Sequence, residues 1–150
     1  MAATYTEEQI ARLMKHFTQA CRAAGLKITH QRTEIYRQLL LVADHPSAET
    51  LHKRLLPMLP TISLDTVYRT LATLEQHGLV SRIQTAESQA RFEAAHEPHH
   101  HLICSRCKRV LDFHWPAVDG IDLPPAAKQW GQVDSKTIVI YGICSNCATR

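Results

Sequence analysis

The sequence predicts an α+β protein in two parts, a helical part followed by a smaller strand-rich part. Apolar residues recur at helical spacing through most of residues 7–77. Short strand-like segments follow, and four of the five cysteines lie after residue 103. A chain of 150 residues is long enough for two small domains. We therefore expect a first domain of residues 1–93 and a second of residues 94–150.

The composition excludes several classes of protein. Hydrophobic residues make up 45% of the chain and charged residues 21%, which is typical of a folded globular protein. No apolar run approaches the roughly 20 residues of a membrane helix, and the N-terminus lacks the features of a signal peptide. A cytoplasmic protein without a membrane partner is expected. Its cysteines are then reduced, which favours metal or redox chemistry over disulfides.

Four helices are predicted in the first domain from their apolar spacing and their start signals. The first covers residues 7–24 and places Cys21 on its apolar stripe, as a buried thiol without chemistry. The second begins at a Thr29 cap, carries Ile35, Leu39 and Val42, and ends at the pre-proline His45. Ser47 caps a third, short helix that stops at Pro57, and Ser63 caps a fourth that covers residues 64–77.

Two strands follow the fourth helix, at residues 79–83 and 89–93, around a polar turn at residues 85–88. Short helices followed by a hairpin outline a winged helix-turn-helix domain, although other helical domains share this periodicity. Helices three and four, joined by residues 57–62, are then the helix-turn-helix.

The fourth helix is the candidate recognition helix for double-stranded DNA. Val67, Leu71 and Leu74 are expected to face inward. The opposite face is expected to present Thr66, Arg69, Thr70 and Thr73, with Tyr68 at its flank. Arginine and short hydroxyl side chains suit contacts to bases and phosphates, but an ordinary solvated face has the same composition. Residues 1–83 hold ten Lys or Arg against seven Asp or Glu, whereas residues 84–150 hold seven of each. The positive excess lies in the DNA-binding half.

Two C-x2-C pairs, separated by 36 residues, carry the strongest motif. The pairs are Cys104 with Cys107 and Cys144 with Cys147. Four thiolates provide the tetrahedral coordination of structural Zn²⁺, with no position left for a catalytic water. Redox-active pairs are the alternative, but neither pair opens a helix after a strand as such motifs do. A zinc ion would support a domain too small to be stable alone, and a partner subunit in a homodimer would add further support.

A histidine cluster precedes the first cysteine pair. On a strand at residues 99–103, His99 and His101 point to one face and His100 to the other. Glu93 and Asp112 lie nearby in the chain, so nitrogen and oxygen ligands are available for Fe²⁺, Mn²⁺ or Zn²⁺. A solvent-exposed histidine run is the alternative. The string His96-Glu-Pro-His-His100 also matches the H-E-x-x-H motif of zinc-dependent hydrolases, but Pro98 interrupts the helix that this motif requires.

Taken together, these segments resemble the ferric uptake regulator (Fur) family of bacterial metal-dependent repressors, over nearly the whole chain. The matching segments are Ile28-Thr-His-Gln-Arg32, His45-Pro-Ser-Ala48, Asp65-Thr-Val-Tyr-Arg69, Arg91-Phe-Glu93, His99-His-His-Leu-Ile-Cys-Ser-Arg-Cys107, Val110-Leu-Asp-Phe113 and Tyr141-Gly-Ile-Cys-Ser-Asn-Cys147. The resemblance implies a winged-helix domain, an α/β dimerisation domain and a regulatory metal site between them.

Residue by residue, the resemblance implies a function for each matching position. The regulatory Fe²⁺ or Mn²⁺ site would comprise His45, Glu93, His99, His101 and Asp112. Tyr68 and Arg69 match the family's DNA-contacting pair, and Thr29 with Arg32 match a segment that approaches the DNA backbone. The homodimer would bind a palindromic operator when the metal is bound.

The signal that the repressor senses is assigned from individual residues. Asp112 matches the peroxide-sensing (PerR-like) branch of the family, and Trp115 and the doubled C-x2-C motif also resemble that branch. In that branch, peroxide reacts with Fe²⁺ and a ligand histidine is oxidised; His45 and His99 occupy the corresponding positions. Glu93 departs from this branch, where Asp is usual, so iron-uptake and zinc-uptake regulation are the alternatives. Pro98 and Lys136 stand where a third metal site of some members has histidine.

Overall fold

Seven helices and five strands form the part of the chain that the structure describes, which is residues 5–42, 44–85, 89–94 and 97–150 of a computed structural model. The chain divides into two compact units, Met1–His96 and Glu97–Arg150. The predicted boundary after residue 93 lies inside strand β2, whose pairing continues to Ala94. No helix among the described residues is long and apolar enough to cross a membrane.

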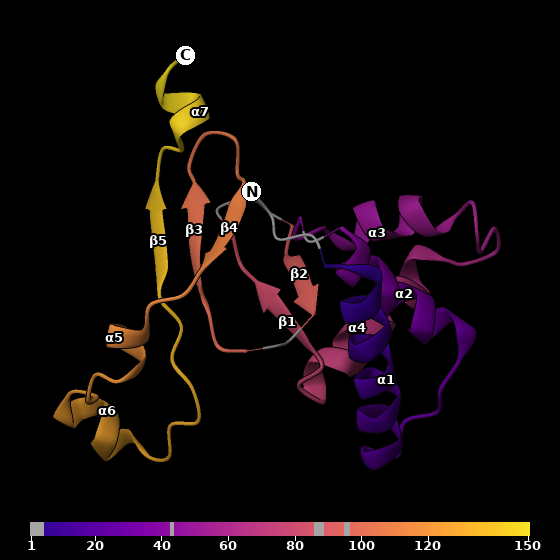
Figure 1. The fold of residues 1–150 in the computed structure, drawn as a ribbon, viewed down its shortest axis with the longest axis horizontal. Coiled ribbons are helices and arrows are strands. Elements are labelled where there is room, and N and C mark those ends of the chain that lie inside the picture. Colours follow the sequence, from indigo (N-terminus) through magenta and orange to yellow (C-terminus); the bar gives the residue numbers. More distant parts are fainter. Residues whose placement is uncertain (1–4, 43, 86–88, 95–96) are drawn as a thin grey trace. The chain divides into compact units, whose positions relative to one another are not determined.

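The first unit contains four α-helices, drawn from indigo to magenta in Figure 1. They are α1 (Glu7–Ala23), α2 (His30–Leu41), α3 (Ala48–Leu55) and α4 (Leu64–Gln76). The predicted caps are confirmed: the side chains of Thr29, Ser47 and Ser63 each accept a hydrogen bond from the backbone N–H three residues later. Each such cap stabilises its helix by about 1 kcal/mol.

The core of the first unit lies between these helices and the hairpin. Phe17 of α1 stacks on Tyr36 of α2, with ring centroids 4.1 Å apart. Val67, Leu71 and Leu74 of α4 are fully buried, as predicted, and so is Cys21. Burial raises the pKa of the Cys21 thiol, which agrees with an unreactive core residue.

Two details of the predicted helices are wrong. Helix α2 ends at Leu41 instead of His45, and Val42 is exposed. Pro46 disfavours helix at His45, whose backbone has a positive φ of 53°. Thr70 is buried and not on the open face of α4, because it lies one helical turn from both Val67 and Leu74.

The predicted hairpin consists of β1 (Val80–Ile83) and β2 (Arg91–Ala94), which pair antiparallel. Gly78 has a φ of 72° and ends α4, while the Leu79 N–H donates to the Leu74 carbonyl. The predicted polar turn falls partly on residues 86–88, which lie outside the described residues.

The second unit contains a three-stranded sheet in the order β4-β3-β5. Strand β3 (His100–Cys104) pairs antiparallel with β4 (Val110–Phe113) and parallel with β5 (Val139–Gly142). The predicted strand at residues 99–103 corresponds to β3. Parallel pairing needs a long crossover, which α5 (Pro116–Asp119) and α6 (Pro125–Trp130) supply.

The two ends of this sheet carry different helices. Figure 1 shows α7 (Ser145–Ala148) and the β3–β4 turn at one end of the sheet, and α5 and α6 at the other. Strand β3 therefore runs from the histidine cluster at its start to Cys104 at its end.

Candidate metal centres and nucleic-acid interface

The four cysteines of the C-x2-C pairs meet at the end of the sheet beside α7. The sulfur atoms of Cys104, Cys107, Cys144 and Cys147 all lie within 4.8 Å of one another. The distance between the sulfurs of Cys107 and Cys144 is 3.7 Å. A tetrahedral zinc ion with Zn–S bonds of about 2.3 Å places its sulfurs roughly 3.8 Å apart. The cluster therefore fits a structural zinc ion.

Backbone N–H groups donate hydrogen bonds to one sulfur of this cluster and favour its thiolate form, which binds a cation. The N–H groups of Cys144 and Cys107 donate to the Cys104 sulfur and lower the pKa of that thiol to about 6. The pKa of Cys147 is raised to about 12, first because its thiol proton is shared with the Cys144 sulfur, then through burial and hydrogen bonds to the other sulfurs, and least through repulsion by the Cys104 thiolate. A divalent cation removes that repulsion, since it stabilises all four thiolates together.

The first unit contains a buried pair of residues that were predicted for the regulatory site, His45 and Glu93. The His45 Nε2 lies 3.0 Å from the Glu93 Oε2, and both side chains are less than a tenth exposed. The pair combines one imidazole nitrogen with one carboxylate oxygen, which are ligands that Fe²⁺, Mn²⁺ and Zn²⁺ accept.

The backbone around His45 is held by strand β2. The Arg91 guanidinium donates to the His45 carbonyl at 3.2 Å, and the Phe92 N–H donates to the Pro46 carbonyl at 2.9 Å. These bonds hold His45 in its left-handed backbone conformation and set its imidazole beside Glu93. Arg91 was not predicted to have a function from the sequence; its place two residues before Glu93 on the strand was the available signal.

The second unit brings His99, His101 and Asp112 together. The Nε2 atoms of His99 and His101 lie 3.6 and 3.4 Å from the same oxygen, Oδ1 of Asp112. His101 and Asp112 face each other across the antiparallel β3–β4 pair. The two imidazole rings meet edge to face, with centroids 4.9 Å apart. The predicted alternation of side chains along this strand is thus confirmed.

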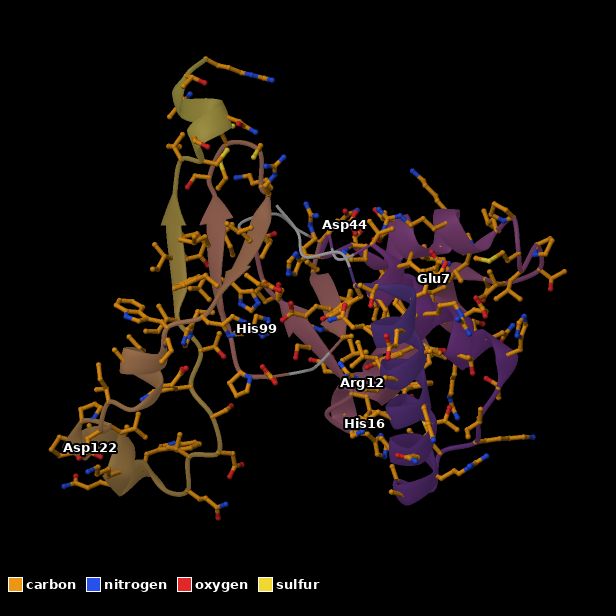
Figure 2. The ribbon with its side chains drawn as sticks, in the orientation of Figure 1. Glu7, Arg12, His16, Asp44, His99 and Asp122 are labelled. Atoms are coloured by element: carbon orange, nitrogen blue, oxygen red, sulfur yellow. The ribbon has the colours of Figure 1, made fainter. Side chains whose placement is uncertain are left out.

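The orientation of His99 suits a metal ligand. Its Nδ1 lies 2.9 Å from the Glu97 carbonyl, so Nδ1–H can donate there while Nε2 is directed toward Asp112. Figure 2 labels His99 at the start of β3, at the sheet end opposite α7. His96 of the H-E-x-x-H string lies outside the described residues, and residues 97–100 contain no helix on which that motif could work.

The open face of α4 carries the predicted DNA-contacting residues. Arg69 forms an ion pair with Asp65, with 2.9 Å between Nε and Oδ2, and both side chains are more than two thirds exposed. Tyr68 is exposed, and its hydroxyl donates to Glu49 of α3. Thr66 is half-buried, and its backbone N–H donates to the Ser63 cap. Arg69 and Tyr68 are therefore accessible to a ligand.

Thr29 and Arg32 lie at the start of α2. The Thr29 hydroxyl accepts the Arg32 backbone N–H at 3.1 Å, and the Arg32 guanidinium donates to the Lys27 carbonyl at 2.6 Å. Thr29 thus shapes the helix start, and Arg32 places a cation beside it. Glu49, the partner of Tyr68, was not predicted from the sequence; its acidic character in the first turn of a capped helix was the sole signal.

Comparisons with known proteins agree with this arrangement. The chain matches the Ferric uptake regulator family over residues 23–141. It is 33% identical to the peroxide-responsive repressor PerR of Staphylococcus epidermidis over 94% of this chain and 89% of that protein. It is 30% identical to the peroxide operon regulator of Bacillus subtilis over 91% of this chain and 94% of that protein.

A solved structure shares the fold over almost the full length. The ferric uptake regulator Fur of Helicobacter pylori, described as having three functional metal binding sites, superposes with a TM-score of 0.75. The match covers 99% of this chain and 97% of that chain, with 25% sequence identity.

Proposed function

Because this chain belongs to the ferric uptake regulator family, we propose that it is a metal-dependent repressor that senses peroxide and acts on cytoplasmic DNA. The family is one of dimeric DNA-binding transcription regulators, so the chain is a regulator and not a hydrolase. The observation that carries the metal-sensing part is the convergence of His99 and His101 on one oxygen of Asp112.

The proposed regulatory site combines residues of both units. His45 and Glu93 belong to the first unit, and His99, His101 and Asp112 to the second. Three neutral imidazoles and two carboxylates balance the charge of one divalent ion, which lowers the cost of bringing the ion out of water. An ion held by residues of both units would favour the arrangement that binds DNA, by as much as its affinity for that arrangement exceeds its affinity for others.

Peroxide sensing rests on the chemistry of these ligands. Fe²⁺ held by these residues would supply the electron that cleaves the O–O bond of peroxide, and His45 or His99 would be the ligand imidazole that takes up the released oxygen. The side chains of His45 and His99 are each less than a tenth exposed, which limits the contact of both rings with bulk water. An oxidised ring binds the ion less well, so the repressor would leave the DNA.

The other two functions belong to separate parts of the chain. Zinc on Cys104, Cys107, Cys144 and Cys147 would hold the end of β3 against the segment after β5, as the support of the dimer domain. On DNA, Arg69, Tyr68 and Thr66 would approach the major groove, with Arg32 and Thr29 at the backbone. Two such units in a dimer match a palindromic operator.

The deciding experiment compares two metals before and after oxidation. Purified zinc-loaded protein is titrated onto a duplex, chosen by selection from a random-sequence pool, in the presence of Mn²⁺ or Fe²⁺. Micromolar hydrogen peroxide is then added to each complex. We expect both metals to support binding and peroxide to abolish it in the Fe²⁺ form alone. Binding that needs no metal, or that peroxide leaves intact in both forms, would contradict the proposal.

Iron-uptake regulation is the second candidate, because of Glu93. This residue departs from the pattern of the peroxide branch, and its buried carboxylate contacts His45 directly. If the Fe²⁺ complex on DNA survives peroxide while binding still depends on Fe²⁺, this second function is correct. Mass spectrometry of His45 and His99 after treatment gives an independent readout, since added oxygen marks a peroxide sensor.

A further inference from the structure

The recognition helix is linked to the preceding helix through one side-chain contact. The hydroxyl of Tyr68, which is 42% exposed, donates a hydrogen bond to Oε1 of Glu49. Glu49 lies two residues after the Ser47 cap, in the first turn of α3. The contact spans 19 residues of sequence and joins the two helices of the helix-turn-helix. It therefore acts on a side chain that the proposed function places against DNA.

Glu49 is ionised at neutral pH for identifiable reasons. Hydrogen bonds from the Tyr68 hydroxyl, from its own backbone N–H and from Ser47 lower the pKa of Glu49. The N-terminus of α3 also favours a negative charge at this position. A carboxylate can accept hydrogen bonds but cannot donate them. The single proton of the Tyr68 hydroxyl must therefore be the one that lies between the two groups.

This arrangement limits what Tyr68 can offer to DNA. Once its proton is used, the phenol oxygen can only accept a hydrogen bond. In the major groove the donors are the N6 amino group of adenine and the N4 amino group of cytosine. Phosphate oxygens and the O6 and N7 atoms of guanine are acceptors, so they cannot form a hydrogen bond with the phenol oxygen. The Glu49 charge also repels phosphate.

The ion pair between Arg69 and Asp65 is more easily exchanged than the hydrogen bond between Tyr68 and Glu49. Arg69 and Asp65 are 81% and 69% exposed, so their ion pair is weak and Arg69 can exchange Asp65 for a group on DNA. Glu49 is half-buried and is itself held by the start of α3, so it remains with Tyr68.

We propose that Glu49 is a specificity-determining residue, which makes Tyr68 a hydrogen-bond acceptor for an adenine or cytosine amino group. The inference rests on the proposed function, since it requires that α4 enter the major groove. Glu49 is a positioning residue, because it acts through Tyr68 and need not touch DNA itself.

The test removes single amino groups from DNA. The wild-type protein with Mn²⁺ first selects a duplex from a random-sequence pool. Each adenine of that duplex is then replaced by purine and each cytosine by 2-pyrimidinone, which lack the amino group. We expect about a tenfold loss of affinity for wild type at one position in each half-site, from the loss of one hydrogen bond in the interface. Tyr68→Phe should show no loss at that position.

Two variants of Glu49 distinguish the effect of its hydrogen bond with Tyr68 from the effect of its charge. Glu49→Asp keeps the charge but shortens the side chain by one methylene, so its carboxylate no longer reaches the Tyr68 hydroxyl. The loss of affinity on removing the amino group should then fall below about threefold. Glu49→Gln removes the charge but keeps an acceptor oxygen, so the penalty should persist while affinity for random-sequence duplexes rises. Asp122→Asn is the matched charge control, because Asp122 is 96% exposed and lies in the second unit, near α6 (Figure 2).

The outcomes are distinguishable. A pool that enriches no sequence would overturn both the proposed function and this inference. A pool that enriches a sequence supports DNA recognition. If Glu49→Asp then retains the wild-type penalty, or Glu49→Gln loses it, the inference alone is overturned. Thermal melting of each variant confirms that it is folded.

Discussion

The imidazole of His100 is fully buried and lies with its Nε2 2.9 Å from Oδ1 of Asp119, at the end of α5. On the other side of the ring, the Ile138 N–H donates to Nδ1 at 3.0 Å. Because Nδ1 accepts that bond, Nε2 carries the proton and donates it to Asp119. One neutral histidine thus joins β3 to both ends of the crossover that leads to β5.

The first prediction concerns this tie. His100→Ala leaves the Ile138 N–H and the Asp119 carboxylate without their partner, so we expect the free energy of unfolding to fall by about 2–3 kcal/mol. Urea unfolding of the zinc-loaded protein measures this. Asp119→Asn keeps an oxygen that can accept the Nε2 proton and should cost less than about 1 kcal/mol. Equal losses in the two variants would contradict the assigned direction of the hydrogen bond.

The second prediction concerns the cysteine cluster. Cys104→Ser removes one of the four sulfur ligands and should abolish both zinc content and dimerisation, since the strand end and the segment after β5 are no longer joined. Metal analysis and sedimentation measure the two losses. Cys21→Ala removes a thiol from the core of the first unit and should keep zinc at one ion per subunit. A zinc-free dimer of the Cys104 variant would refute the structural assignment.

The third prediction concerns the histidines of the second unit. His99→Ala should abolish Mn²⁺-dependent DNA binding but retain the zinc, because its imidazole shares Asp112 with His101. Fluorescence anisotropy with a labelled duplex measures DNA binding, and metal analysis measures the zinc content. His114→Ala is the control: its ring centroid lies 6.4 Å from that of His99, and it is absent from the proposed ligand set. Its Mn²⁺ response should match wild type.

The fourth prediction concerns Arg91, which holds the His45 carbonyl. Arg91→Lys should raise the Mn²⁺ concentration needed for half-maximal DNA binding by about tenfold, since groups that orient a ligand affect metal affinity on that scale. Arg82→Lys changes a neighbouring arginine that stacks on Phe92 and forms an ion pair with Glu75 of α4. It should leave the Mn²⁺ requirement unchanged; an equal shift in both variants would point to a general effect on the hairpin.

The fifth prediction concerns Arg69. Arg69→Ala should lower affinity for the selected duplex by at least about tenfold, through the loss of one base contact. The free energy of unfolding should change by less than about 0.5 kcal/mol, because the ion pair with Asp65 is exposed. Asp65→Asn frees Arg69 and should maintain or increase affinity. If Arg69→Ala binds the duplex with wild-type affinity, the assignment of α4 to the DNA interface is wrong.

Local signals predicted much of the fold. The caps at Thr29, Ser47 and Ser63 act within three residues, so the sequence alone locates the starts of α2, α3 and α4. The alternation along β3 likewise follows from strand geometry, which sets His99 and His101 on one face. Errors occurred where neighbouring elements decide, as at Thr70, which the packing around α4 buries.

The sequence by itself therefore determined the starts of α2, α3 and α4, the pairing of cysteines in two C-x2-C motifs, and the chemical types of the side chains proposed for metal binding and DNA contact. The tertiary structure alone decided which partners orient them: Arg91 at His45, Glu49 at Tyr68 and Asp119 at His100. These contacts span 46, 19 and 19 residues respectively. Periodicity and caps report on neighbours within one or two turns, whereas contacts across such distances form only when separate elements pack against one another.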